Sequence, residues 1–363
     1  MGWAQLRQTP ASANAVASPL SLANAMAMLQ LGAKGRSAAE IAAVFEPTSS
    51  GNTLLVERLA EILPELTQPQ VGITFVNANR LWLDRSVAKA IEPRYAQAVQ
   101  SQLQSSADGV DFTQPQAAAT SINNWVSQIT QGHITQLLKA AQITPSTHMV
   151  MTNAVHFKGQ WSRPFNPNRT AEAGFTLADG SVVQVPTMHA NLRARLSEQQ
   201  GAILLELPYG NGEFALQIGL PAPGQTLEQL QASLSAAQWA QWSAGLAATE
   251  LDISLPRFKV DSPAAPLKPV LEKLGVQTLF GSAADLSGIT SAQSLMLDQV
   301  YQTAQVQVDE QGAEASAATA AVIAAKSLAL PTRLDVNRPF LFTIVHNPTQ
   351  SVLFVGRLAN PTL

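Results

Sequence analysis

The chain has 363 residues, of which 46% are hydrophobic and 13% charged, and its formal net charge is -3. This length is enough to bury a large core, and the weak net charge without any basic run excludes general binding to nucleic acid or another polyanion. The absence of cysteine excludes disulfides and thiol catalysis, and no apolar run approaches the roughly 18 residues of a membrane-spanning helix.

The N-terminal segment, MGWAQLRQTPASANAV, lacks the apolar core of a secretory signal. We therefore expect either a protein that stays inside the cell or a mature or trimmed form of an exported one. The sequence leaves the compartment open.

Helical signals dominate the first third of the chain. Ser18 is a plausible N-cap, and Leu22, Met26 and Leu29 recur at helical spacing until Gly32 ends the run. Further helices are predicted over residues 93–103 and 117–129, with a short one over residues 2–8.

Most of the remaining chain alternates in the manner of β-strands. In residues 71–83, Val71, Ile73 and Phe75 share one face with Asn77 and Asn79, which predicts a long, half-buried strand. A helix is predicted over residues 266–276. Further strands are predicted from Met149 onward and within residues 175–188, 203–208, 214–221, 251–260, 299–308 and 340–345, with a C-terminal hairpin within residues 338–361.

Residues 308–331, VDEQGAEASAATAAVIAAKSLALP, join two of these strands and consist mostly of small side chains. Alanine favours helices, but no apolar stripe at helical spacing supports one here. At a period of two, one face carries Ala313, Ala315, Ala317, Thr319, Ala321 and Ile323. The pattern predicts an extended strand that needs little room and has no sheet of its own.

Signatures of enzymes and metal sites are missing from the sequence. GNGEFA, within residues 209–215, fits a loose dinucleotide pattern, but a strand follows it, so a hairpin turn is the better interpretation. No G-x-S-x-G elbow or phosphate loop occurs. Five histidines never adopt the helical spacing of a metal site and are expected to be structural or exposed: His133, His148, His156, His189 and His346. We therefore expect no enzymatic activity, no metal and no cofactor.

Several motifs resemble those of one family, the serpins, which are suicide protease inhibitors. In chain order they are the SPLS to LGAKG segment from Ser18, QGHI at residues 131–134, TNAVHFKGQW followed by PF, FGSAADLSGIT at residues 280–290, the hinge DEQGAEASAATAAVI, and the C-terminal RPFLFTIVHNPTQSVLFVGRLANP. The resemblance spans nearly the whole chain. It implies one α+β serpin domain over residues 1–363, with about three mostly antiparallel sheets, eight or nine helices and an exposed reactive-centre loop at about residues 310–331.

The resemblance also implies the positions of the functional residues. The scissile bond falls between Lys326 and Ser327. The hinge comprises Glu310, Gly312, Ala313, Glu314, Ala315, Ser316, Ala317, Ala318 and Thr319. A polar cluster beneath the central strands, the shutter, comprises Ser18, Ser21, Asn153 and Gln302, where Gln302 stands in place of the family's histidine. The point where insertion begins, the breach, comprises Trp161, Arg257 and Glu310, and an ion pair between Glu310 and Arg257 is expected.

The implied partner is a trypsin-like serine protease held in a covalent complex by a monomeric inhibitor, and the family favours an extracellular or periplasmic location. Lys326 suits such a protease, which carries a carboxylate in its specificity pocket. Because the segment after Ser327 is longer than usual, Leu328 or Leu330 could instead meet a chymotrypsin-like or elastase-like enzyme, and a cysteine protease is a further alternative. A non-inhibitory carrier remains the other interpretation, in which Lys326 is only a solvated charge.

Overall fold

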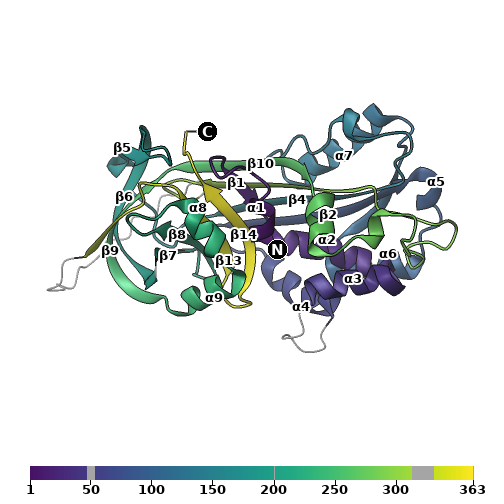
Figure 1. Ribbon diagram of the computed structural model, residues 1–363, viewed down its shortest axis with the longest axis horizontal. Helices are drawn as coiled ribbons and strands as arrows, with labels where there is room; N and C mark the ends of the chain where they lie inside the picture. The colour runs from purple at the N-terminus through teal and green to yellow at the C-terminus, as the bar shows by residue number, and fades with distance from the viewer. Residues whose placement is uncertain (47–53, 200, 313–330, 363) are drawn as a thin grey trace.

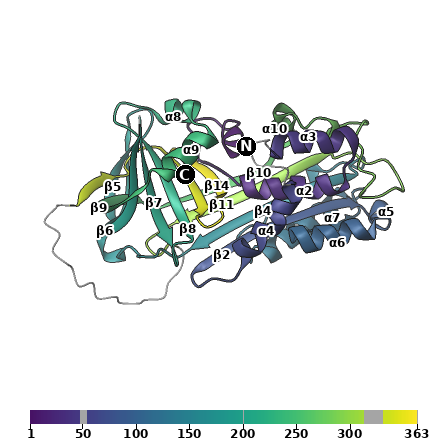
Figure 2. The same cartoon turned by 90° about the horizontal axis from the view of Figure 1, so that it is seen from below.

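The computed structural model describes residues 1–46, 54–199, 201–312 and 331–362. Within them the chain forms ten α-helices and fourteen strands, and the strands assemble into a five-stranded and a nine-stranded sheet. Figures 1 and 2 show the strands of the nine-stranded sheet curled at one end of the molecule and most of the helices at the other. The α+β class is confirmed.

The five-stranded sheet has the order β10-β11-β4-β2-β3. Its strands are β10 (Phe258–Pro266), β11 (Gln299–Val308), β4 (Met149–Gly159), β2 (Ile73–Asp84) and β3 (Ser106–Val110). Neighbouring strands are antiparallel except for two parallel pairs, β11 with β4 and β2 with β3. Nearly every residue of β4 is buried because helices and strands cover both of its faces.

The nine-stranded sheet has the order β1-β14-β13-β8-β7-β6-β9-β12, with β5 paired to β6. Its strands are β1 (Ala15–Ala17), β5 (Ala171–Thr176), β6 (Val182–Gln199), β7 (Ala202–Tyr209), β8 (Phe214–Pro221), β9 (Ala247–Pro256), β12 (Thr332–Asp335), β13 (Phe340–His346) and β14 (Ser351–Leu358). About three sheets were expected. The described strands form two, because the 18-residue β6 pairs with β5 at its start, with β9 along its middle and with β7 at its end.

The helices largely follow the sequence signals. They are α1 (Gly2–Leu6), α2 (Pro19–Gly32), α3 (Gly35–Phe45), α4 (Leu55–Thr67), α5 (Arg85–Ala88), α6 (Pro93–Leu103), α7 (Pro115–Ile129), α8 (Leu227–Ser233), α9 (Ala236–Ala244) and α10 (Lys268–Leu274). Ser18 caps α2 as predicted, since its hydroxyl accepts a hydrogen bond from the Ser21 amide. None of the helices in the described residues is long and apolar enough to cross a membrane.

One strand prediction was wrong. Residues 251–260 were expected to form a single strand, but the chain breaks at Arg257, so that β9 joins the nine-stranded sheet and β10 the five-stranded one. The Arg257 amide donates to the Pro186 carbonyl at 2.9 Å, one step beyond the Thr187–Pro256 pair that ends the β6–β9 ladder. This break places the Arg257 side chain where the two sheets meet.

Candidate functional site

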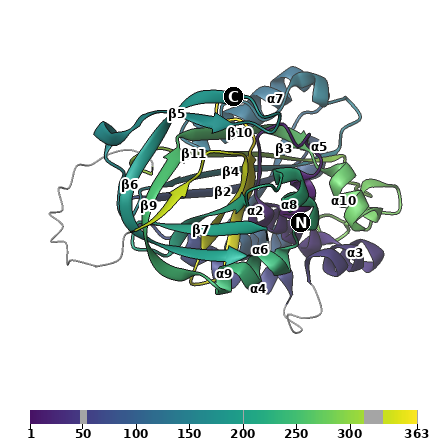
Figure 3. The same cartoon turned by 60° about the vertical axis from the view of Figure 1, so that its left-hand side comes forward.

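The centre of the five-stranded sheet is the pairing of β4 with β11. The two strands are parallel and in register over eight pairs, from Gln299 opposite Val150 to Val306 opposite Phe157. Figure 3 shows β10, β11, β4 and β2 in succession across the sheet. Because no tight turn can join parallel neighbours, these two strands come from distant parts of the chain and can separate without breaking a hairpin.

α7 packs on one face of this central pair. Ala118, Ala119, Ile122 and Val126 of the helix form a cluster of buried apolar residues with Val150 and Ala154 of β4 and Tyr301 of β11. The opposite face belongs to the main core, which includes Val155 and Ala304. Anything that widens the sheet between β4 and β11 must therefore also disturb the contacts of α7.

The structure brings together Ser18, Ser21, Asn153 and Gln302 on the core side of the central pair. The Gln302 side-chain amide donates to the Ser18 carbonyl and to Asn153 Oδ1, both at 2.9 Å. Its oxygen accepts from the Ser18 amide and from Gln5 Nε2, both at 3.1 Å. A primary amide offers two donors and two acceptor positions, so Gln302 is fully satisfied in this buried place. Gln302 therefore uses all of its own hydrogen-bonding positions here.

Sequence reasoning missed three members of this polar cluster. Asn153 Nδ2 also donates to Asn79 Oδ1, the Ser21 hydroxyl donates to Asn77 Oδ1 at 2.5 Å, and Gln5 reaches Gln302 from α1. The two asparagines did carry a signal, since they share the face of an otherwise apolar strand. Gln5 carried none, because it lies 297 residues from its partner.

The predicted breach residues also lie together, at the C-terminal end of β11. Arg257 Nε donates to both carboxylate oxygens of Glu310, at 2.6 and 2.7 Å, so the expected ion pair is present. The Thr170 hydroxyl is a further donor to Glu310, and no motif in the sequence indicated this contact. Burial alone would raise the pKa of Glu310, but the hydrogen bonds from Arg257 and Thr170 outweigh it and hold the pKa below its usual value. Glu310 is therefore a buried, paired carboxylate.

Trp161 fastens the segment that follows β11. Its indole Nε1 donates to the Asp309 carbonyl at 2.7 Å, and its amide donates to the Gln311 carbonyl at 3.0 Å. Gly312 then has a φ of +88°, and a Cβ added there would lie 2.2 Å from the Gly159 carbonyl oxygen. Only glycine fits this turn, which seats the start of the loop against the end of β4.

The rest of the predicted loop lies outside the described residues. This applies to the scissile pair Lys326 and Ser327 and to the hinge residues Ala313, Glu314, Ala315, Ser316, Ala317, Ala318 and Thr319. Of the predicted hinge, the structure describes Glu310 and Gly312.

Two histidines form an unusual contact beneath α7. His156 of β4 stacks on His133, which follows α7, with 4.0 Å between ring centroids and 12° between planes. His156 is buried, and neither ring nitrogen has a hydrogen-bond partner among the described residues. Burial first, then the nearby His133 and Lys158, lower the pKa of His156 from 6.5 to about 4.

Acid should destabilise the folded protein through His156. The unfolded chain takes up this proton near pH 6.5 and the folded protein only near pH 4, so the contribution of neutral His156 is complete above pH 6.5 and is lost between those values. The total loss is roughly 3 kcal/mol. His156→Phe keeps a ring against His133 and should flatten the profile in urea unfolding between pH 7.5 and pH 4.5. Identical pH profiles for the two proteins would contradict this assignment.

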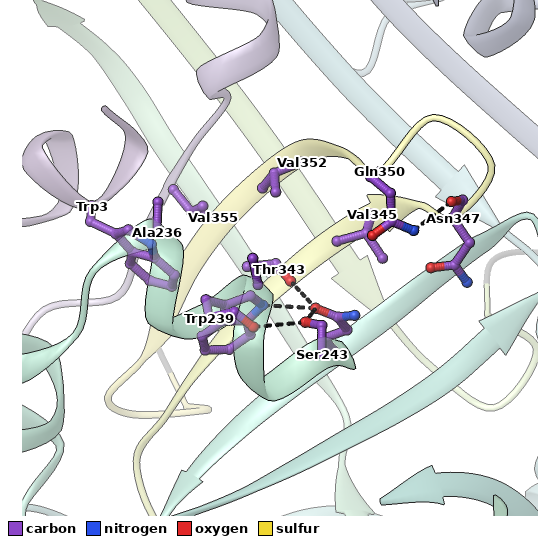
Figure 4. A pocket seen from close by; sticks show the side chains of 12 residues that line it. Trp3, Ala236, Trp239, Ser243, Thr343, Val345, Asn347, Gln350, Val352 and Val355 are labelled. Atoms are coloured by element: carbon purple, nitrogen blue, oxygen red, sulfur yellow. Dashed lines mark hydrogen bonds between the residues drawn. The ribbon is translucent and has the colours of Figure 1, made fainter. Parts of the chain in front are cut away.

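A small pocket lies between α1, α9 and the β13–β14 hairpin. Figure 4 shows Trp3, Trp239, Val345 and Val352 around it. Gln217 also lines the pocket, and its amide oxygen accepts hydrogen bonds from Trp239 Nε1 and from the hydroxyls of Ser243 and Thr343. The cavity measures about 80 Å³. This is well below the ~300 Å³ at which sites for small organic ligands begin.

The fold and the site are those of a class of protease inhibitors, not of enzymes. The family model described as "Serpin (serine protease inhibitor)" matches residues 3–361, and the chain belongs to the serpin family. Human serpin I2 is 34% identical over 354 residues, which cover 96% of this chain and 86% of that protein.

Solved structures of serpins also match this chain over nearly its whole length. The structure of Manduca sexta serpin-12 has a TM-score of 0.87 and 26% identity, covering 99% of this chain and 96% of that one. Human thyroxine-binding globulin, solved as a complex with thyroxine, has a TM-score of 0.85 and 27% identity, covering 98% of this chain and 94% of that one. The family thus includes both protease inhibitors and a thyroxine-binding protein.

Proposed function

We propose that this protein is a suicide inhibitor of trypsin-like serine proteases, in which the cleaved loop inserts between β4 and β11. The observation that best supports this proposal is the parallel pairing of these two strands. Residues 309–312 lie at the C-terminal ends of both. A chain that leaves β11 and turns back into the sheet runs antiparallel to β11. Because β4 is parallel to β11, the same chain also runs antiparallel to β4 and can pair with both.

The proposed reaction uses the catalytic machinery of the protease. Its serine attacks the Lys326 carbonyl, the bond to Ser327 breaks, and the new amino group of Ser327 departs while Lys326 stays esterified to the enzyme. Insertion of the released hinge then carries the protease along and distorts its active site before water hydrolyses the ester. The inhibitor supplies no catalytic group.

The energy of insertion is sufficient for this purpose. One parallel pairing is exchanged for two antiparallel ones, which adds on the order of ten hydrogen bonds at ~1 kcal/mol net each. That sum is similar to the whole stability of a domain, ~5 to 15 kcal/mol. The uninserted sheet is then held by a kinetic barrier.

We assign this barrier to the two groups of residues described above. Ser18, Ser21, Asn153 and Gln302 tie β4 and β11 to the start of α2, and their hydrogen bonds must rearrange before the strands separate. Trp161, Arg257 and Glu310 hold the point where the loop enters, and the small hinge residues from Ala313 to Thr319 follow. We also propose that residues 1–363 act as one domain, since one buried apolar cluster joins residues from both sheets.

The alternative is a carrier function, which the likeness to thyroxine-binding globulin favours. One observation favours the inhibitor. The hinge sequence between Ala315 and Ala325 contains no proline, charge or aromatic residue.

Incubation with trypsin should give an SDS-resistant 1:1 complex and release a C-terminal fragment that begins at Ser327. Lys326→Ala should abolish this complex. Lys259→Ala removes a half-exposed lysine that pairs with Asp261 and should leave the complex intact, which makes it the matched control. Digestion of the wild type without a complex would favour the carrier. A complex formed only with chymotrypsin, with a fragment beginning at Ala329, would overturn the trypsin-like specificity.

A further inference from the structure

A larger cavity lies where several connecting segments meet, away from the central strands. It measures about 610 Å³ and is walled by residues of the N-terminal segment, the β5–β6 turn, the start of α8 and the β12–β13 connection. This volume falls within the ~300 to 1,000 Å³ of sites for small organic ligands. Leu177, Pro221, Leu227 and Pro339 supply apolar wall.

One cation lines this cavity, and its geometry leaves room for a ligand. Arg338 Nε and Nη2 both donate to the Pro221 carbonyl, at 3.0 and 2.6 Å, and Nη1 donates to Asn337 Oδ1 at 3.3 Å. A guanidinium has five N–H donors, so these three bonds leave one on each terminal nitrogen. The carbonyl occupies the Nε side of the guanidinium, which leaves donors on the two terminal nitrogens that match a bidentate anion.

Arg338 is also without a counter-charge. It forms no ion pair among the described residues, and burial lowers its pKa. Arg357 is fully buried and likewise has no acidic partner, but its three nitrogens all donate to nearby neutral acceptors. The other charged residue of the cavity wall is the exposed Glu228, which carries the opposite sign.

We propose that this cavity binds a small amphipathic anion, with its carboxylate or sulfonate on the terminal nitrogens of Arg338 and its apolar body against Leu177, Leu227 and Pro339. The proposal does not depend on the inhibitory mechanism. Glu228 limits which anions the cavity accepts, because its own negative charge on the wall opposes the binding of an anionic head group.

The site would also connect to the strand that follows the loop in the chain. Asn337, Arg338 and Pro339 lie one residue beyond the end of β12. The intervening Val336 amide donates to the Ser254 carbonyl, and the Thr176 amide donates to the Asn337 carbonyl, both at 2.9 Å. A bound anion would therefore stabilise the connection between β12 and β13 and raise the melting temperature of the intact protein.

Two fluorescent probes test the proposal. 1-Anilinonaphthalene-8-sulfonate is an amphipathic anion, and N-phenyl-1-naphthylamine has the same aromatic body without the sulfonate. The anionic probe should bind wild type at one saturable site. Arg338→Gln should weaken that binding about tenfold or more, as expected for the loss of a charge-assisted hydrogen bond, and should leave the neutral probe unaffected.

Two further variants separate the site from general effects on folding. Glu228→Gln should tighten binding of the anionic probe, a gain that misfolding cannot produce. Arg193→Gln removes an exposed arginine of β6 and should change nothing. The proposal is overturned by unsaturable binding, by equal affinities of wild type and Arg338→Gln, by equal losses in the two arginine variants, or by no gain in Glu228→Gln.

Discussion

A disulfide between β4 and β11 should switch inhibition off, and reduction should restore it. Val155 and Ala304 are direct partners in the register of these strands, both are buried, and the chain has no cysteine that could mispair. Val155→Cys with Ala304→Cys changes little volume, and paired neighbours in a sheet lie within the ~4.4 to 6.8 Å range of Cα distances in disulfides. When oxidised, the double variant should form no SDS-resistant complex and should be digested as a substrate, because the loop cannot pass between the linked strands.

The matched control links β4 to its other neighbour. Ala78 and Ala154 are partners in β2 and β4, and a cysteine pair there leaves the path between β4 and β11 open. This control should inhibit in both redox states. If the oxidised Val155 and Ala304 variant still traps protease, the loop does not enter between these strands.

Thr319→Arg should convert the inhibitor into a substrate. At a period of two, Thr319 lies on the face of small residues that must fit inside the sheet, and an arginine there would bury an unpaired charge at a cost of several kcal/mol. Insertion should then be slower than hydrolysis of the acyl-enzyme, so trypsin should regain its activity and release cleaved inhibitor.

Ser316→Arg is the control for the opposite face, where the sequence already carries a charge at Glu314. It should reduce complex formation far less than Thr319→Arg does. Equal effects of the two substitutions, measured as inhibitor molecules consumed per protease trapped, would contradict the assigned faces of the hinge.

The sequence predicted local structure well wherever a local signal existed. The cap of α2 at Ser18 and the limits of α6 (Pro93–Leu103) follow from residues within a few positions of each other. The break at Arg257 had no such signal, since apolar strand residues continue on both sides. It appears only in the pairing, because β9 pairs with β6 and β10 pairs with β11.

The site was predictable only as far as its motifs extend. Ser18, Ser21, Asn153, Gln302 and Glu310 lie in recognisable segments, and the structure brings them to their expected neighbours. Gln5 and Thr170 belong to the same networks through folding alone, because their partners are more than a hundred residues away. Side chains recruited from distant segments leave no pattern in the local sequence.

The central claim is that the severed loop becomes a new strand between β4 and β11, and the most direct measurement is thermal unfolding of the protein after a single cut within residues 320–330. About ten added hydrogen bonds should raise the melting temperature of the cleaved form by roughly 10 to 15 °C above that of the intact form. Equal melting temperatures for the two forms would show that the loop stays outside the sheet and would contradict the account.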